Sequence, residues 1–285
     1  MPSVVVTGVS SGIGWGTAKV LLQRGFRVFG SVRKQEDADR LSAEWGEAFI
    51  PLLFDITDEQ AVRNAAAAVN GHLHGSTLSG LVNNAGIALP APLIYQPIDV
   101  YRRQLEVNLV GPLTVTQAFI GLLGADHDRA GMPGRVVNIS SIGGKMAGPF
   151  LGAYHASKFG LEGFSDTLRI ELMPHGIDVI VIGPGAVATS IWDKAAKVDI
   201  SLYQNTEYSK ALGSYGMYMM EGGRKGYPPE YIGKVVWKAL TTTHPHVRYG
   251  YAVVPHPLVN WAIPRLLPRR RIDSVIAGNL GLKRH

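Results

Sequence analysis

The stretch Thr7-Gly8-Val9-Ser10-Ser11-Gly12-Ile13-Gly14 decides the fold. It follows a β-branched run, Ser3–Thr7, and precedes residues with helical spacing, so we expect a tight turn between a first strand and a first helix. Glycines in such a turn let the backbone approach a pyrophosphate, and the start of the helix offers free N–H groups to phosphates. The stretch therefore predicts a dinucleotide site that includes Gly8, Ser10, Gly12, Ile13 and Gly14.

The same stretch has a second interpretation. Gly8-Val9-Ser10-Ser11-Gly12 matches G-x-S-x-G, the nucleophile elbow of serine hydrolases, with Ser10 as the nucleophile. Such an elbow normally lies after several strands, whereas a single strand precedes it here. An elbow also has no need of Gly14. We therefore rank the serine hydrolase below the dinucleotide site and keep it as an alternative.

Short apolar runs alternate with helical patterns along the rest of the chain. The other strands are expected at Arg27–Val32, Ala48–Phe54, Gly80–Val82, Arg135–Ile139, Asp178–Ile182 and Arg248–Val254. Continuously apolar strands separated by helices are typical of a parallel sheet that is covered on both faces. The sequence therefore predicts an α/β fold, a Rossmann-type doubly wound parallel sheet of about seven strands. No linker or repeat divides residues 1–285, so we expect one domain.

Composition and charge exclude several classes of protein. With 46% apolar and 18% charged residues, the 285-residue chain is too apolar for disorder. The absence of cysteine excludes a disulfide scaffold and a thiolate–metal site. The net charge is +6, and residues 261–285 carry +5 of it, so the body of the chain is nearly neutral. This distribution argues against a nucleic-acid partner.

Metal binding and membrane insertion are not expected either. The His72/His74 and His244/His246 pairs lie in Gly-, Thr- and Pro-rich stretches with no supporting carboxylate motif, so we interpret them as loop histidines. No apolar run reaches the roughly 20 residues that a bilayer requires. No basic region precedes the first strand, as a signal peptide would require. We therefore expect a cytoplasmic protein.

Two segments interrupt the alternation of strands and helices. Residues 190–228 hold five of the 11 tyrosines and three of the seven methionines without a clean period, which predicts an irregular, substrate-binding lid. Residues 251–285 form a basic C-terminal extension, in which four prolines prevent a long amphipathic helix. We expect the extension to be a pocket wall or a subunit contact, and an anionic membrane surface is the alternative.

Three polar residues further along have a spacing that indicates chemistry. Ser141 follows the strand Arg135–Ile139, at the carboxyl edge where ligands bind in open α/β sheets. Tyr154 comes thirteen residues later, and Lys158 follows four residues after it. Since both belong to a helix that starts near Ala153, they lie one turn apart on one face. An ammonium group at that distance is expected to lower the pKa of the phenol.

Together these motifs resemble the short-chain dehydrogenase/reductase family, in its main branch. The match covers residues 3 to about 190 and runs in the family's order. Its pieces are Thr7–Gly14, Asp55, Asn83-Asn84-Ala85-Gly86, Asn108, Ser141-x12-Tyr154-x3-Lys158 and Pro184-Gly185-x-x-x-Thr189. The stretch around Lys158 is most similar to the subgroup of steroid and retinol dehydrogenases and carbonyl reductases.

The resemblance implies an oxidoreductase that interconverts a secondary alcohol and a ketone or aldehyde on a fairly apolar substrate. In this family Tyr154 would be the general acid and base, Ser141 would hold the substrate oxygen, and Lys158 would also bind the nicotinamide ribose. Asn108 would order a water for a proton relay. The resemblance further implies a homodimer or homotetramer and a cofactor site that includes Asp55, Ile56, Asn84, Ala85, Gly86, Pro184, Gly185, Val187 and Thr189.

The end of the second strand predicts which nicotinamide cofactor binds. NAD-binding relatives carry an acidic residue there, and NADP-binding relatives replace it with a base. Here Val32 stands at that position and is followed by Arg33 and Lys34, either of which can bind a phosphate. We therefore expect NADP(H) in preference to NAD(H). A cofactor-binding regulator without catalysis and relatives that dehydrate or epimerise are the remaining alternatives.

Overall fold

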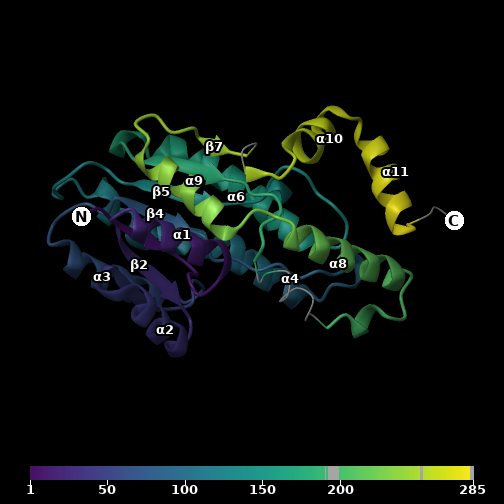
Figure 1. Ribbon diagram of the computed structural model, residues 1–285, viewed down its shortest axis with the longest axis horizontal. Coiled ribbons are helices and arrows are strands. Elements are labelled where there is room, and N and C mark those ends of the chain that lie inside the picture. Colours follow the sequence, from purple (N-terminus) through teal and green to yellow (C-terminus); the bar gives the residue numbers. More distant parts are fainter. Residues whose placement is uncertain (190, 192–198, 251–252, 283–285) are drawn as a thin grey trace.

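Seven parallel strands form one sheet in the order β3-β2-β1-β4-β5-β6-β7, as a computed structural model of the chain shows (Figure 1). The structure describes residues 1–189, 191, 199–250 and 253–282. The predicted Rossmann-type doubly wound sheet is confirmed. The strands are β1 (Ser3–Val6), β2 (Arg27–Val32), β3 (Phe49–Leu53), β4 (Gly80–Asn83), β5 (Arg135–Ile139), β6 (Asp178–Ile182) and β7 (Arg248–Tyr249).

The first six strands lie within one residue of their predicted ends, but the seventh is shorter. It was expected to reach Val254, and it ends at Tyr249. A β-carbon at Gly250 would overlap the guanidinium of Arg248, which folds back beneath the sheet edge. Beyond the two strands, the carbonyl of Val253 accepts a hydrogen bond from the backbone N–H of Gly185, three residues after the end of β6 (2.9 Å). Tyr251 and Ala252 lie outside the described residues.

Helices cover both faces of the sheet. Side chains alternate along β1, so Val4 and Val6 belong to one apolar core and Val5 to the other. The first core includes residues of α1 (Gly12–Gln23), α2 (Gln35–Trp45) and α9 (Pro229–Thr241). The second includes residues of α3 (Glu59–Leu73), α5 (Gly111–Phe119) and α6 (Gly152–Glu171).

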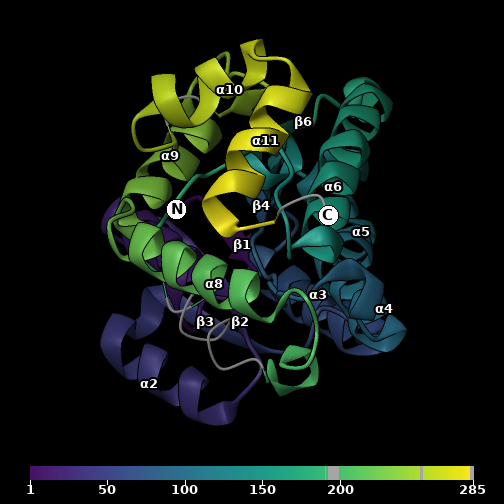
Figure 2. The same cartoon turned by 90° about the vertical axis from the view of Figure 1, so that its right-hand side faces the viewer.

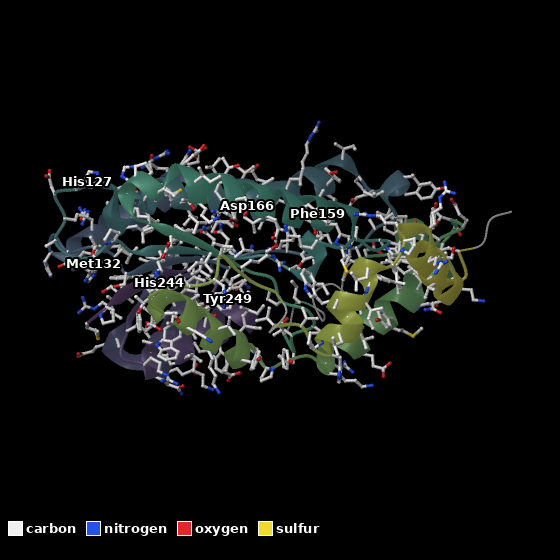
Figure 3. The ribbon with its side chains drawn as sticks, turned by 90° about the horizontal axis from the view of Figure 1, so that it is seen from above. His127, Met132, Phe159, Asp166, His244 and Tyr249 are labelled. Carbon is white, nitrogen blue, oxygen red and sulfur yellow. The ribbon has the colours of Figure 1, made fainter. Side chains whose placement is uncertain are left out.

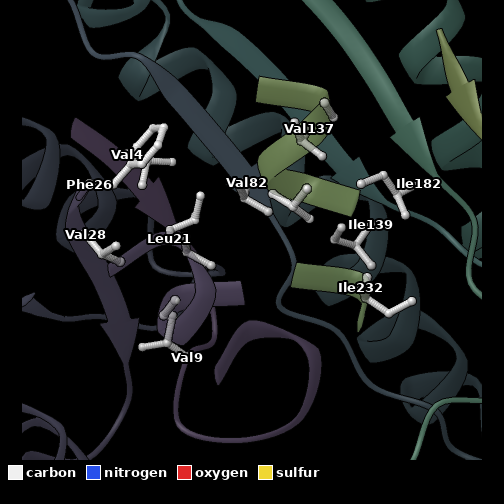
Figure 4. Packing of buried hydrophobic residues seen from close by; sticks show 14 of the residues in the cluster. Val4, Val9, Leu21, Phe26, Val28, Val82, Val137, Ile139, Ile182 and Ile232 are labelled. Atoms are coloured by element: carbon white, nitrogen blue, oxygen red, sulfur yellow. The ribbon is translucent and has the colours of Figure 1, made fainter. Parts of the chain in front are cut away.

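The first core fixes α1, whose start carries the glycine turn, against the sheet. Figure 4 shows Leu21 of α1 and Ile232 of α9 among the β-branched side chains of β1, β4, β5 and β6. All of these side chains are almost fully buried. Since a well-packed core admits little displacement, the position of the turn relative to the strand ends is fixed by this packing.

Two glycines let α1 and α9 approach closely (Figure 1). A β-carbon at Gly233 would lie 2.6 Å from the backbone oxygen of Gly16. One at Gly16 would lie 2.5 Å from the backbone carbon of Pro229. The contact of α9 with α1 therefore requires glycine at both positions.

One end of the molecule carries the segments that interrupted the sequence pattern. Figure 2 shows α8 (Ser209–Arg224), α10 (Ile263–Leu266) and α11 (Arg269–Leu280) at this end, together with α4 (Ile98–Leu105). Residues 190–228 were expected to be irregular, yet α8 is a regular helix, because Ala211 and Leu212 pack against Phe150 and the end of α11. Residues 190 and 192–198 of the predicted lid lie outside the described part.

The C-terminal extension consists of short helices divided by proline. Pro268 precedes α11, which has 12 residues, so the expected absence of a long helix holds for the described residues. Lys283 and Arg284 of the basic cluster are not among them. No helix in the described part of the chain has the length and apolarity needed to cross a bilayer.

We expect Gly233→Ala to lower the free energy of unfolding by about 1–3 kcal/mol, because its β-carbon would push α9 away from α1. Urea unfolding followed by circular dichroism measures this. The control is Gly163→Ala on α6, where a β-carbon meets nothing within 4 Å, and which should stabilise by about 0.5–1 kcal/mol. Equal effects of the two substitutions would contradict this account of the helix contact.

Candidate active site

The ends of β1 and β4 are tied together where the strand order reverses. The hydroxyl of Thr7 accepts hydrogen bonds from the backbone N–H groups of Asn84 (2.9 Å) and Ala85 (3.0 Å). The side-chain amide of Asn84 donates in return to the carbonyl of Thr7 (2.8 Å). Ligands of open α/β sheets bind in the crevice at such a switch point.

The glycine turn lies at this crevice in a conformation that requires glycine. Gly8 and Gly12 have φ values of +72° and +63°. A β-carbon at Gly8 would lie 3.1 Å from Ala85, and one at Gly12 would lie 3.3 Å from Thr189. Gly14 was predicted to be part of the dinucleotide site, but it does not line the cavity: it lies against the backbone of Gly8, where a β-carbon would overlap the Gly8 carbonyl.

A cavity of about 790 Å³ extends from the glycine turn along the carboxyl edge of the sheet. Its size is typical of ligand sites. It brings together residues that are far apart in the sequence. Those expected to hold a cofactor that line it are Gly8, Ser10, Gly12, Ile13, Arg33, Asp55, Ile56, Asn84, Ala85, Gly86, Tyr154, Lys158, Pro184, Gly185, Val187 and Thr189.

Charged groups gather where the cavity meets β2 and β3. Asp55 lies between two guanidinium groups, 3.6 Å from Arg33 and 3.5 Å from Arg103. Burial acts to raise the pKa of Asp55, but hydrogen bonds from Thr57 and the charges of Arg103 and Arg33 hold it below its usual value. The carboxylate therefore stays ionised and keeps both guanidinium groups at this end of the cavity.

One predicted basic residue does not line this end of the cavity, and two arginines that were not predicted lie close to it. Lys34 is exposed at the start of α2 and does not line the cavity. Arg40, in the middle of α2, donates a hydrogen bond to the carbonyl of Ser10 in the glycine turn (3.0 Å). Nothing in the local pattern distinguished Arg40 or Arg103 from ordinary surface arginines, since both are brought to the site by the fold.

Ser141, Tyr154 and Lys158 line the same cavity. Tyr154 and Lys158 lie in the first turns of α6, and Ser141 lies just after β5. The hydroxyl of Ser141 accepts a hydrogen bond from the N–H of Gly143 (3.0 Å) and is hydrogen-bonded to the phenol of Tyr154. The ammonium of Lys158 donates to the carbonyl of Ile139 (2.9 Å) and lies 5.9 Å from the centre of the Tyr154 ring.

The expected acidic phenol is not found. Burial raises the pKa of Tyr154 above its ordinary value, and the hydrogen bond from Ser141 offsets only part of this. Burial also lowers the pKa of Lys158 to about 8, against the opposing charge of Glu162. The prediction was wrong because it weighed the ammonium charge without the loss of water around both groups.

A buried carboxylate lies one turn beyond Lys158. Glu162 receives two hydrogen bonds from the guanidinium of Arg248 (2.8 and 3.0 Å) and an ion pair from Lys145 (3.2 Å). Burial acts to raise the pKa of Glu162, but Arg248, Ser140 and Lys145 keep it below its usual value. This carboxylate connects α6 to β7 and to the loop that follows Ser141.

Asn108 is fully buried and does not line the cavity. It lies in the π-helical turn Glu106–Val110, a form often found at functional sites. Its side chain accepts a hydrogen bond from the N–H of Ile87 (2.8 Å) and donates to the carbonyl of Ile87 (2.9 Å) and to Ser157 (3.0 Å). It thus fixes the chain beyond Gly86 against α6.

Apolar side chains from α8 enclose the cavity opposite the sheet. Tyr215, Tyr218 and Met219 line it there, with Met146 and Leu151 from the α6 side. The C-terminal extension contributes Val254, Pro255, His256 and Asn260 to the lining of the cavity.

The histidine pairs predicted to lie in loops do not line the cavity, and His72 is not in a loop: it lies in the last turn of α3, which ends at Leu73. Figure 3 shows His127, Met132 and His244 at the end of the molecule opposite α8 and α11. Across the described ranges of the chain, no group of three His, Asp or Glu side chains is placed to hold a metal ion.

Comparisons with known proteins agree with this architecture. The family model for short chain dehydrogenase matches residues 2–199. NADPH-dependent 3-dehydrocapnine reductase from Ornithobacterium rhinotracheale is 39% identical over 280 residues, or 98% of each chain. Human retinol dehydrogenase 5 is 41% identical over 289 residues, covering 96% of this chain and 87% of the relative.

A solved structure shows the same fold. A short-chain dehydrogenase/reductase from Burkholderia phymatum in complex with NAD has a TM-score of 0.78 and 19% identity, covering 96% of this chain and 94% of that one. The family match and the identity to its members disfavour the serine hydrolase alternative for Ser10. The chain belongs to the short-chain dehydrogenase family and is an NAD(P)-dependent oxidoreductase.

Proposed function

We propose that the protein is an NADP-dependent oxidoreductase that interconverts a secondary alcohol and a ketone or aldehyde on a fairly apolar substrate. One observation carries the proposal: the Ser141–Tyr154 pair and Lys158 line the same cavity as the glycine turn. The cavity therefore accommodates a dinucleotide at the start of α1 and a carbonyl beside the phenol. When bound, the nicotinamide supplies or accepts the hydride.

Tyr154 is the general acid in the reducing direction. Its raised pKa keeps the phenol protonated at neutral pH, so it holds the proton that the carbonyl oxygen requires. Ser141 accepts from Gly143, which leaves its own O–H free to donate to the phenol or to the substrate oxygen. In the reverse direction the phenolate takes the proton of the alcohol.

Lys158 supports this proton transfer. Its ammonium has a pKa of about 8, below that of the phenol, so a proton passes downhill from Lys158 to a Tyr154 phenolate. Asn108 holds the backbone of Ile87 next to Gly86, where a β-carbon would lie 3.8 Å from the Lys158 nitrogen. This placement supports the relay role that the family resemblance implies for Asn108.

The preference for NADP rests on positive charge at the β2 end of the cavity. Arg33 follows β2 directly, and both Arg33 and Arg103 line this end of the cavity. Two guanidinium groups on this side of the glycine turn suit a phosphate monoester. The NADPH dependence of the 39%-identical reductase supports the same preference.

The apolar substrate is supported by the α8 wall, because tyrosine and methionine side chains form most of it. We also infer a homo-oligomer. Leu113, Phe159 and Ile170 are 39–60% exposed on α5 and α6, and Figure 3 shows Phe159 on the outer side of α6. Large exposed apolar side chains on neighbouring helices are consistent with a subunit interface.

Replacing Tyr154 by Phe removes the acid and keeps the ring. We expect kcat for carbonyl reduction to fall by roughly 10²–10⁴, with NADPH binding retained. A panel of ketones and aldehydes, followed by NADPH absorbance, measures turnover, and cofactor fluorescence measures binding. Tyr101→Phe on α4, outside the cavity, is the matched control and should keep full activity. Wild-type protein that binds NADPH yet reduces nothing would instead be a cofactor-binding regulator.

Activity should depend on the charge of Lys158. The ammonium is present below pH 8 and is lost above it, so kcat/KM for reduction should decline as the pH rises through about 8. Lys158→Arg keeps its charge at high pH, so any residual activity of this variant should not show the decline. A flat wild-type profile between pH 7 and 9.5 would contradict the role of this ammonium.

Replacing Arg33 tests its role in the preference for NADPH over NADH. We expect Arg33→Ala to lower kcat/KM with NADPH by about 10- to 100-fold, because a charged hydrogen-bond partner of the phosphate is lost, and to leave the value with NADH nearly unchanged. Arg63→Ala, which breaks an exposed ion pair on α3, is the control. Equal wild-type kcat/KM values for the two cofactors, or an NADH preference, would refute the assignment.

A further inference from the structure

The residue after Tyr154 is a histidine whose ring bridges both ends of a cavity wall. Residues 142–148 (the 142–148 loop) follow Ser141, and Ile142, Gly143, Met146, Ala147 and Gly148 line the cavity. His155 Nδ1 lies 3.0 Å from the carbonyl oxygen of Gly143. Its Nε2 lies 3.0 Å from the backbone nitrogen of Gly148. One imidazole therefore connects the beginning of the loop to its end.

These two partners determine the protonation state of the ring. A carbonyl oxygen only accepts, so Nδ1 must carry a proton toward Gly143. A backbone N–H only donates, so Nε2 must be an unprotonated acceptor for Gly148. Both bonds exist together only in the neutral Nδ1–H tautomer. A second proton on Nε2 would place two donors face to face at Gly148 and break that bond.

The bond at Gly143 continues to Ser141. The same residue that accepts from His155 through its carbonyl donates through its N–H to the hydroxyl of Ser141 (3.0 Å). A β-carbon at Gly143 would lie 2.9 Å from His155 Nδ1, so only glycine leaves room for the ring. His155 thereby orients the serine hydroxyl that faces Tyr154.

The groups around His155 favour the neutral ring. Burial lowers its pKa, and the hydrogen bond to the Gly143 carbonyl offsets part of this. The ring meets the edge of Tyr154 at 5.9 Å between centres, and Tyr215 of α8 lies beside Gly148. Burial raises the pKa of both phenols, so neither is negatively charged near neutral pH.

Charged side chains also lie on the elements that surround His155. Lys158 follows on α6, and Lys145 within the 142–148 loop is paired with Glu162 at 3.2 Å. Tyr218, Lys225 at the end of α8 and His256 of the C-terminal extension are further titratable residues that line this cavity.

We propose that His155, as the neutral Nδ1–H tautomer, is a positioning residue that fixes Ser141 and the 142–148 loop for reaction, and that its protonation releases the loop at Gly148. The kinetic part of this inference rests on the proposed function. The tautomer and the two hydrogen bonds do not. Acid would then lower activity without touching Tyr154 itself.

The tautomer is tested directly by nuclear magnetic resonance. In protein labelled with ¹⁵N-histidine, the His155 signal is assigned by its loss in His155→Phe. We expect an Nδ1–H pattern that persists below the pH of about 6.5 at which a free imidazole gains its second proton. An Nε2–H pattern, or titration at the ordinary pH, would overturn the proposal whatever the enzyme does.

Kinetics test the positioning role with three variants, of which two keep one hydrogen-bonding group each and one keeps neither. His155→Asn retains a hydrogen-bond donor near the Nδ1 position, and His155→Gln places an acceptor near the Nε2 position. His155→Phe keeps an aromatic ring but has neither group. We expect kcat to fall about tenfold in His155→Phe, the size of one lost hydrogen bond near a reacting group, and less in His155→Asn, which still orients Ser141.

The pH profile separates positioning from a general loss of stability. Wild-type kcat/KM should fall only at a pH below the ordinary imidazole value of about 6.5, and this acid limb should be absent in His155→Asn and His155→Gln, which cannot titrate. Thermal unfolding shows whether each variant is folded. Wild-type activity in His155→Phe, or an acid limb that persists in all variants, would overturn the proposal. Wild-type protein without any turnover would instead refute the proposed function and leave the tautomer test standing.

Discussion

The hydroxyl of Thr7 and the amide of Asn84 hold the site open. They join β1 to β4 where the two strands end, and from that point the chain leaves in opposite directions along the sheet. The glycine turn opens on one side of this junction and the Asn84–Gly86 turn on the other. These hydrogen bonds fix the glycine turn and the Asn84–Gly86 turn relative to each other, and both turns line the cavity.

Burial determines the protonation states of the ionisable residues on α6. The first turns of α6 place a phenol, an imidazole, an ammonium and a carboxylate on one stretch of helix, at Tyr154, His155, Lys158 and Glu162. Burial removes water from each of these side chains, and a different set of hydrogen-bond or charged partners offsets that loss in each case. Glu162 remains ionised because Arg248 and Lys145 bind it, whereas Lys158 is left with a backbone carbonyl, and burial lowers its pKa to about 8. The carboxylate also connects this helix to the C-terminal segment, because Arg248 stacks on Trp261 at 4.9 Å.

Much of the fold and part of the site could be predicted from residue order. Six strands and the start of α6 follow from runs of apolar residues and from turn residues, which act locally. The same local information failed at the seventh strand, where the side chain of Arg248 folds toward Glu162, 86 residues earlier. It failed again at α8, whose apolar face is completed by Phe150 and the end of α11. Lys34 was expected beside the cofactor from its place after Arg33, but its side chain is exposed at the start of α2 and does not line the cavity.

The sequence by itself determined the order of strands and helices, the glycine turn and the Ser–Tyr–Lys spacing, because each depends on neighbours within a few residues. Only the tertiary structure decided which of these residues share a cavity and that Arg103 of α4 joins them. It alone showed that the phenol of Tyr154 is harder, not easier, to ionise, and that His155 bridges two glycines. These properties depend on how far each side chain is shielded from water and on which hydrogen-bond partners it has. Both are determined by segments that are distant in the sequence.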